Sequence, residues 1–247
     1  MKNYVRMSIG ALLILCSVIA ISSYTQTVNA HANNANDAEQ LIAVLKKKLS
    51  TIKDFRVDLG ITIELEYLNI PDAKAQYYYK APNKSRIISE GFGLLPKQGI
   101  GLPTNDIINV AHTAIISGYE DYEGKKLTKV KIIPTDESSD IILSTLWIEE
   151  KSLLIYKVTT STRKGTLDMV FSYASPEQKY GLPRSTTVQF VLPQFALPKS
   201  LTGDLQKNNR VQKDMKKEVK GKAIVTYSNY SINKGLRDEV FNEKNNK

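Results

Sequence analysis

The sequence is poor in the side chains on which redox, metal and acid–base chemistry most often depends. Its 247 residues include one cysteine and two histidines, which argues against a disulfide scaffold and against a Cys/His metal site. His112 is the only histidine well inside the chain, and no Gly-x-Ser-x-Gly motif is present. A lone histidine beside Val110, Ala111 and Ala114 is more typical of a structural residue than of a general base. We therefore expect no catalytic residue, no metal and no cofactor, the one alternative being a hydrolase of unfamiliar type that uses His112.

The first thirty residues differ in composition from the rest of the chain. Lys2 and Arg6 precede an apolar run over residues 9–21, and small residues follow around Ala30. This arrangement is typical of a secretory signal peptide, and the apolar run is shorter than an ordinary membrane span. An uncleaved anchor and lipidation at Cys16 are alternatives, although a lipobox needs a small residue just before the cysteine. The sequence predicts export, with a signal peptide over 1–30 and a single domain over 31–247.

Basic residues outnumber acidic residues, 34 to 25, which gives a formal net charge of +9. Much of the excess lies between Lys207 and Lys222, where seven basic residues meet only Asp214 and Glu218. Such a run is typical of a solvated loop or a short exposed helix, or else of a patch that makes transient contact with an anionic membrane or an acidic partner protein. Nucleic acid is not expected as a partner, because the run lacks interleaved aromatic residues.

A strict alternation of apolar and polar side chains is the strongest structural signal. Seven apolar residues occupy every second position from Phe55 to Tyr67, and successive side chains of an extended strand point to opposite faces. The pattern predicts one long amphipathic strand of an antiparallel sheet. The same alternation returns at 154–160, 167–173 and 186–192. Turn sequences stand at 81–83, 123–125 and 163–165. The chain is therefore predicted to be mainly β (α+β), with hairpins between neighbouring strands.

Two helices are expected besides the strands. The first follows a cap at Asn36 or Asp37. It places four apolar side chains on one face, namely Leu41, Leu45, Leu49 and Ile52. The second runs from about Asn105 to Ala114, with Thr104 as its cap. A helix with one apolar face is suited to covering an apolar sheet face.

Three short motifs stand in a fixed order along the chain. A tyrosine strand ends in Lys-x-Pro-Asn at Lys80, Pro82 and Asn83; a strand, an acidic turn and a return strand follow over 146–156; a closing strand and tail occupy 225–241. This order resembles the outer-membrane lipoprotein carriers of the LolA-like superfamily. The resemblance implies a strongly curved antiparallel sheet that forms an incomplete β-barrel, with one or two helices over its concave face. It also implies a cavity for acyl chains and a location in the periplasm or cell envelope.

The chain departs from the carriers at the tyrosine strand. In those proteins the residue between Lys and Pro is an arginine that points into the cavity and engages the lid, and here it is Ala81. A nearby inward aromatic residue is replaced by Ser85. Strand parity places Arg86 on the opposite face from Ala81, so the role of the arginine is not transferred to it. The departures favour, as an alternative function, an envelope protein-interaction or stress-sensing module on the same fold.

Strand parity selects the residues that would line the implied cavity. The ligand-binding candidates share the apolar face and are Ile61, Ile63, Leu65, Tyr77, Tyr79, Ala81, Ile87, Tyr156, Phe171 and Phe190. Trp147 is expected to face outward or toward a rim, because Leu146 and Ile148 have the other parity. The resemblance implies a non-enzymatic extracytoplasmic carrier whose partners are lipids or the acyl chains of lipoproteins.

Overall fold

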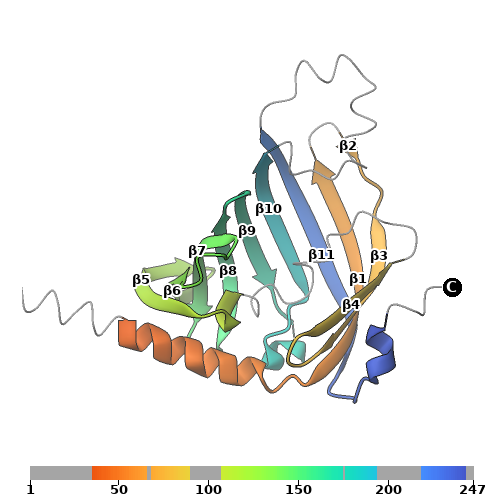
Figure 1. The fold of residues 1–247 in the computed structure, drawn as a ribbon, viewed down its shortest axis with the longest axis horizontal. Helices are drawn as coiled ribbons and strands as arrows, with labels where there is room; N and C mark the ends of the chain where they lie inside the picture. Colours follow the sequence, from red (N-terminus) through yellow and green to blue (C-terminus); the bar gives the residue numbers. More distant parts are fainter. Residues whose placement is uncertain (1–34, 66–67, 90–106, 175, 194–217, 243–247) are drawn as a thin grey trace, which may run out of the picture.

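One antiparallel sheet dominates the chain. The computed structural model describes residues 35–65, 68–89, 107–174, 176–193 and 218–242. The strands lie in the order β4-β3-β1-β11-β10-β9-β8-β7-β6-β5, and β2 pairs with β1 beside this path (Figure 1). Their bounds are β1 Asp54–Leu65, β2 Leu68–Asn69, β3 Ala73–Lys80, β4 Lys84–Ser89, β5 His112–Tyr122, β6 Lys125–Pro134, β7 Ile141–Glu149, β8 Leu154–Thr162, β9 Gly165–Ser172, β10 Ser185–Pro193 and β11 Glu218–Ile232. A helix over residues 35–49 and the short 3₁₀ helices η1 (Glu177–Tyr180) and η3 (Asp238–Phe241) accompany the sheet.

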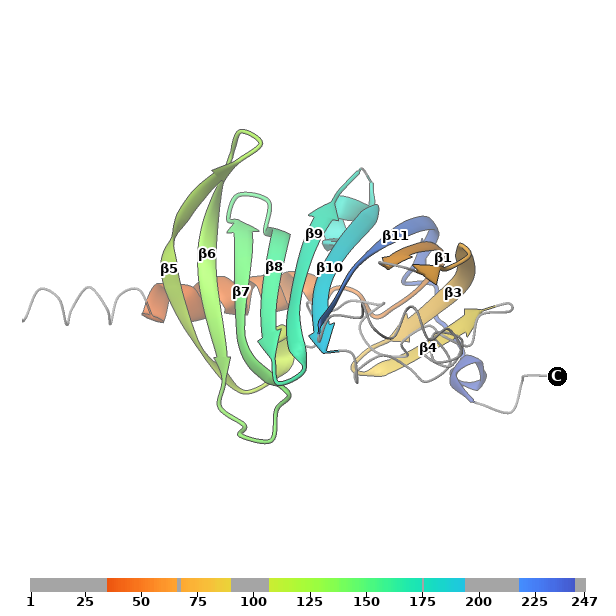
Figure 2. The same ribbon diagram turned by 90° about the horizontal axis from the view of Figure 1, so that it is seen from above.

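The sheet confirms the predicted class, a mainly β chain with an antiparallel sheet and an N-terminal helix. It is open, with β4 at one edge and β5 at the other, and the strand direction turns steadily from edge to edge (Figure 2). The turn sequences at 81–83, 123–125 and 163–165 join β3 to β4, β5 to β6 and β8 to β9, as predicted. The final strand, β11, inserts between β1 and β10 and so connects the first strands to the rest.

The N-terminal helix crosses one side of the sheet, below β5 to β8 (Figure 2). Leu45 and Leu49 are buried, as expected, and Ala38 and Ile42 are buried with them. The predicted cap was wrong, because Asn36 and Asp37 already lie within the helix. Ile52 lies beyond the end of the helix.

The second predicted helix is partly helix and partly strand. Among its described residues, 107–109 are helical, and β5 begins at His112. Ala114 pairs with Ile132 of β6, and its amide donates a 2.8 Å hydrogen bond to the Glu39 carboxylate of the N-terminal helix. These contacts with distant residues outweigh the local preference of the segment for helix.

Several expectations fall on residues outside the described ranges. These are the signal peptide over 1–30, the cap at Thr104 and most of the basic run from Lys207 to Lys222. Of that run, residues 218–222 belong to β11 and so are strand. Within the described ranges, the helices are too short or too polar to cross a bilayer.

Candidate functional site

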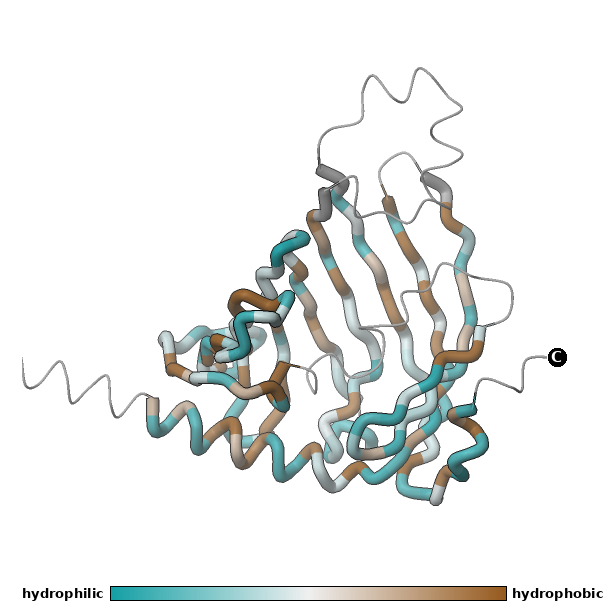
Figure 3. Tube along the Cα trace, in the orientation of Figure 1, coloured by the Kyte–Doolittle hydropathy of each residue, from teal (hydrophilic) through white to brown (hydrophobic). Residues whose placement is uncertain are grey.

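The apolar face of the sheet carries two separate clusters of buried side chains. The helix cluster combines the N-terminal helix with β5 to β9; its buried members are Ala38, Ile42, Leu45, Leu49, Ile107, Ile108, Ala114, Val130, Ile132, Leu146, Ile148, Ile155, Val158, Met169 and Phe171. The β1 cluster belongs to β1, β3, β4 and β11; its buried members are Ile52, Phe55, Val57, Leu59, Ile61, Ala73, Ala75, Tyr77, Leu182, Val225 and Tyr227. Figure 3 shows the alternation of apolar and polar residues along the strands that supplies both.

The two clusters differ in what covers them. In the helix cluster, the four-turn N-terminal helix packs on five strands. Among the described residues, the side chains from outside the sheet that join the β1 cluster are only Ile52, Tyr180 and Leu182. Ile63, Tyr79 and Ile87 of the β1 cluster remain only partly buried. This part of the apolar face is therefore the region on which a ligand-binding role can be based.

The predicted lining residues do not all lie together. Ile61, Ile63, Tyr77, Tyr79 and Ile87 lie together in the β1 cluster. Phe171 instead packs in the helix cluster. Tyr156 contacts the rings of Tyr122 and Tyr173, at centroid distances of 6.3 and 5.6 Å. Ala81 is exposed in the turn between β3 and β4.

Leu65 and Phe190 meet across a glycine of β11. Gly221 pairs with Leu65 on one side and with Phe190 on the other. A Cβ atom at Gly221 would collide with the Phe190 ring and with Cδ2 of Leu65, so only glycine leaves room for both side chains. This residue was not among the sequence candidates; its position, opposite two large apolar residues, becomes evident only when the strand register is known.

Aromatic rings gather where β1, β3 and β11 approach the helix end of the sheet. Phe55 lies 5.7 Å from Tyr77, 5.4 Å from Tyr79 and 6.0 Å from Tyr230, between ring centroids. The buried hydroxyls are satisfied, since Tyr230 donates to the Pro183 carbonyl at 2.8 Å. Burial raises the pKa of the Tyr227 hydroxyl to about 12, so this group stays protonated. The rings form an apolar wall without an ionisable group at neutral pH.

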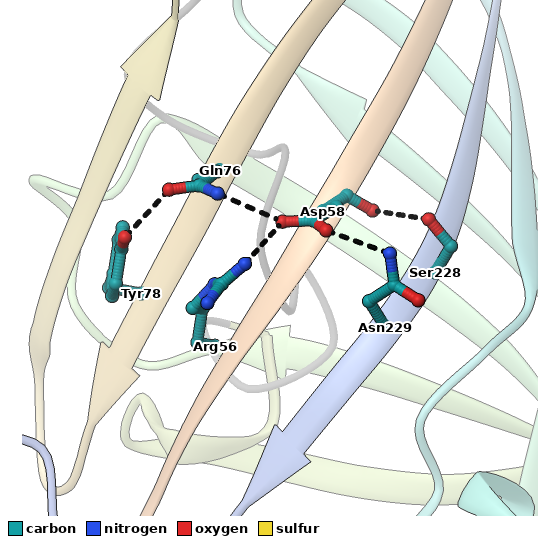
Figure 4. Close-up of polar contacts among 6 residues, drawn as sticks. All are labelled: Arg56, Asp58, Gln76, Tyr78, Ser228 and Asn229. Atoms are coloured by element: carbon teal, nitrogen blue, oxygen red, sulfur yellow. Dashed lines mark hydrogen bonds and ion pairs between the residues drawn. The ribbon is translucent and has the colours of Figure 1, made fainter.

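The opposite face of the same strands holds a polar network centred on Asp58 (Figure 4). Its carboxylate accepts hydrogen bonds from Asn229 on β11 (2.9 Å), Gln76 on β3 (3.1 Å) and Arg56 (3.1 Å). The Tyr78 hydroxyl donates to the Gln76 side chain at 2.7 Å. The bonds from Asn229, Arg56 and Gln76, together with the charge of Arg56, lower the pKa of the Asp58 carboxyl. The network ties three neighbouring strands together.

Arg86 lies on this polar face, as its parity predicts. It stands opposite Tyr78, and its guanidinium donates to the carbonyls of Val240 and Asn242, at 2.7 and 2.6 Å. Lys80 binds the same tail through Asp238, at 2.7 Å. The basic groups of the β3–β4 hairpin therefore hold the C-terminal 3₁₀ helix.

A cavity of about 500 Å³ opens where β1, β9, β10 and β11 lie side by side. Its charged lining side chains have the polar parity and are Glu64, Asp168, Lys220 and Lys222. Lys222 forms an ion pair with Glu64 at 3.5 Å. The lining also contains the apolar side chains of Leu65, Phe190 and Val191, so the cavity offers both charged and apolar contacts.

The His112 ring contacts its own segment of the chain. Nδ1 of His112 lies 2.6 Å from the Val110 carbonyl, a contact that ties the ring to its own main chain. In the part of the chain that the structure describes, no group of three or more His, Cys, Asp or Glu residues could hold a metal ion.

Comparison of the whole fold identifies similar solved structures. A DUF1329 family protein from Desulfovibrio piger is 10% identical, with a TM-score of 0.58 and coverage of 85% of this chain and 98% of that protein. A putative outer membrane lipoprotein-sorting protein domain from Vibrio parahaemolyticus is 13% identical, with a TM-score of 0.51 and coverage of 85% and 97%. A LolA superfamily protein from Nitrosomonas europaea is 11% identical, with a TM-score of 0.52 and coverage of 81% and 97%.

The sequence matches no protein-family model and no curated protein. The likeness is therefore one of fold, and it extends over nearly the whole length of each of the three structures. The resemblance inferred from the motifs around Lys80 and residues 146–156 is confirmed at this level. The chain has the fold of the LolA superfamily and of the lipoprotein-sorting domains.

Proposed function

We propose that the chain is a non-enzymatic extracytoplasmic carrier that holds a lipid, or the acyl chains of a lipoprotein, against the β1 cluster. The observation that carries the proposal is the unequal cover of the apolar face. In the described residues the helix packs on β5 to β9, while Ile63, Tyr79 and Ile87 of the β1 cluster keep part of their surface accessible. The fold shared with lipoprotein-sorting domains supports the same conclusion.

The proposed site binds by burial of hydrocarbon. Each methylene removed from water contributes about 0.8 kcal/mol, so one long chain along the face can offset the cost of ordering it. The partly buried side chains of Ile63, Tyr79 and Ile87 supply accessible apolar surface next to the buried Phe55 and Ile61. In this arrangement the sheet curves around its cargo as an incomplete barrel. The lining is formed by Ile61, Ile63, Tyr77, Tyr79 and Ile87, with Leu65 and Phe190 on either side of Gly221.

Export belongs to the same proposal. Residues 1–30 act as the signal peptide, and residues 31–247 form one lipid-binding domain in the periplasm or at the cell envelope. The loss of the lid-engaging arginine at Ala81 means that release of cargo uses other contacts than those of the resembling carriers.

Native mass spectrometry of the exported protein, followed by organic extraction, is the direct test. We expect a stoichiometric lipid or acylated species, which would also name the class of cargo. An exported protein that carries no bound lipid and fails to take up fatty acids or phospholipids would contradict the carrier function and favour a protein-interaction module.

Two neighbouring isoleucines of β4 provide a matched pair of variants. Ile87 is opposite Tyr77 and belongs to the β1 cluster, whereas Ile88 is opposite Gln76 on the polar face and is 37% exposed. Ile87→Lys should abolish uptake of a fluorescent fatty acid, because it places a charge beside the proposed acyl chain. Ile88→Lys should leave uptake unchanged. Equal uptake by both variants, each shown to be folded by circular dichroism, would refute this site.

A further inference from the structure

The polar face of β6 to β9 carries lysines and apolar side chains in adjoining positions. The strand register places Lys129, Trp147, Lys157 and Val170 side by side, one from each of four consecutive strands. Lys131 and Ile133 follow Lys129 on the same face of β6. Ile133 is 42% exposed and Val170 is 38% exposed. The helix cannot cover these residues, because it packs on the other face of the sheet.

This surface carries more basic than acidic side chains. β6 contributes Lys129 and Lys131 to it, whereas Lys126 has the opposite parity; Asp168, two residues before Val170 on β9, lies on the same face. One carboxylate, that of Glu120, is shared by Lys157 at 3.1 Å and Lys129 at 3.7 Å. Lys131 is exposed and lies next to them on the sheet. The three lysines Lys129, Lys131 and Lys157 outnumber the carboxylates of Glu120 and Asp168, which leaves a small net positive charge on the surface.

Trp147 lies in the middle of the lysines. Its indole N–H donates to Glu120 at 2.8 Å, and the Lys129 ammonium lies 5.5 Å from the centre of its ring. The side chain is half-buried, and it is the single tryptophan of the chain. An indole with one polar and one apolar edge, flanked by ammonium groups, is suited to the boundary between water and lipid headgroups.

We propose that this surface, formed by Lys129, Lys131, Ile133, Trp147, Lys157 and Val170, docks the protein on an anionic lipid bilayer. Lysines near such a surface contribute about 1 kcal/mol each through attraction to the headgroups. The apolar side chains between them add contact with the headgroup region, which favours a bilayer over an acidic protein. Docking through this surface does not depend on the identity of the cargo. It directs the β1 cluster away from the bilayer, because the docking surface and the β1 cluster lie on opposite faces of the sheet.

The emission of Trp147 reports docking without a label. The exported protein is titrated with vesicles of phosphatidylcholine alone, or of phosphatidylcholine with phosphatidylglycerol. We expect a blue shift, and quenching by brominated acyl chains, only with the anionic vesicles. Both should disappear at about 1 M salt, where the Debye length is about 3 Å.

Two sets of substitutions separate this surface from net charge. The triple variant Lys129→Gln/Lys131→Gln/Lys157→Gln should weaken vesicle affinity about 10- to 100-fold. The control Lys47→Gln/Lys151→Gln/Lys179→Gln removes the same charge from the helix, the β7–β8 turn and η1 and should change it little. The single variant Lys131→Glu, at an exposed position, serves if the triple variant fails to fold.

Three results would overturn the proposal. These are an unchanged Trp147 spectrum while the protein sediments with anionic vesicles, equal losses in the two triple variants, and binding to an acidic protein but not to vesicles.

Discussion

The two parts of the apolar face follow one sequence pattern and reach different states. In the helix cluster, Leu146 and Ile148 of β7 are fully buried together with the helix side chains Ile42 and Leu45. In the β1 cluster the same alternation along β1 leaves Ile63 only partly buried, although Leu65 beyond it is buried. Alternation therefore determines which face is apolar, and the path of the helix determines which part of that face becomes a permanent core.

The polar contacts that stabilise the two parts lie on different faces of the sheet. Two hydrogen bonds hold the helix on the apolar face of the sheet. The Glu39 carboxylate accepts one from the Ala114 amide, and the Lys48 ammonium donates one to the Ser152 carbonyl at 2.7 Å. Burial lowers the pKa of the Lys48 ammonium. Around β1, the network of Asp58 fastens the strands from the polar side. Such an arrangement holds β3, β1 and β11 together without using the part of their apolar face that we propose as the binding site.

The largest effect is expected from truncation under the helix. Leu45 is 1% exposed, and Leu45→Ala should lower the free energy of unfolding by about 2–5 kcal/mol, through lost burial and the cavity left behind. Urea denaturation measures the change. Val44→Ala, at a 49% exposed neighbour on the helix, is the control and should cost less than about 0.5 kcal/mol. Fatty-acid uptake per folded Leu45→Ala molecule should be unchanged, and a parallel loss of uptake would mean that the two clusters act as one.

A smaller effect is expected where Leu65 and Phe190 meet. Gly221→Ala forces both side chains away from the new methyl group, and overpacking of this kind costs about 1–3 kcal/mol. The same urea experiment measures it. Adding Phe190→Ala should restore part of the lost stability, because the ring that collides with the methyl group is removed. Additive losses in the double variant would show that the ring does not need the space above Gly221.

Much of the fold could be predicted because its signals are local. The alternation from Phe55 predicted β1, and the glycine and proline turns predicted three of the hairpins. The segment ending at Ala114 was predicted as helix because its residues favour helix locally, and the contacts that make it strand come from Ile132 and Glu39, which are distant in sequence.

The candidate site could be predicted only as a face of the sheet. Parity placed Ile61, Ile63, Tyr77, Tyr79 and Ile87 on one face, and these do lie together. It could not show that Phe171 would be covered by the helix, or that Ile52, predicted as part of the helix face, would join the β1 cluster instead. Which part of the apolar face is buried depends on where the N-terminal helix packs, and the pattern of residues along a strand does not determine that.

The smallest expected change in stability comes from the hydrogen-bond network of Asp58, and it depends on pH. Hydrogen bonds from Asn229 and its neighbours hold the Asp58 pKa below its ordinary value of 3.8. The ionised carboxylate is therefore favoured in the folded state. Its contribution to stability is complete above pH 3.8 and is lost as the pH falls through the lower, folded-state pKa.

Asp58→Asn should accordingly lower stability at neutral pH by no more than about 1 kcal/mol, as for partly exposed charged contacts. The difference in stability between the variant and the wild type should disappear at acidic pH. Thermal melts from pH 7 to about pH 2 would measure it. In an Asn229→Ala background the pH-dependent gap should narrow, because the strongest hydrogen bond to the carboxylate is gone. A gap that stays constant over the whole pH range would show that the Asp58 side chain acts through packing rather than charge, and that the strands around β1 are held from the apolar side after all.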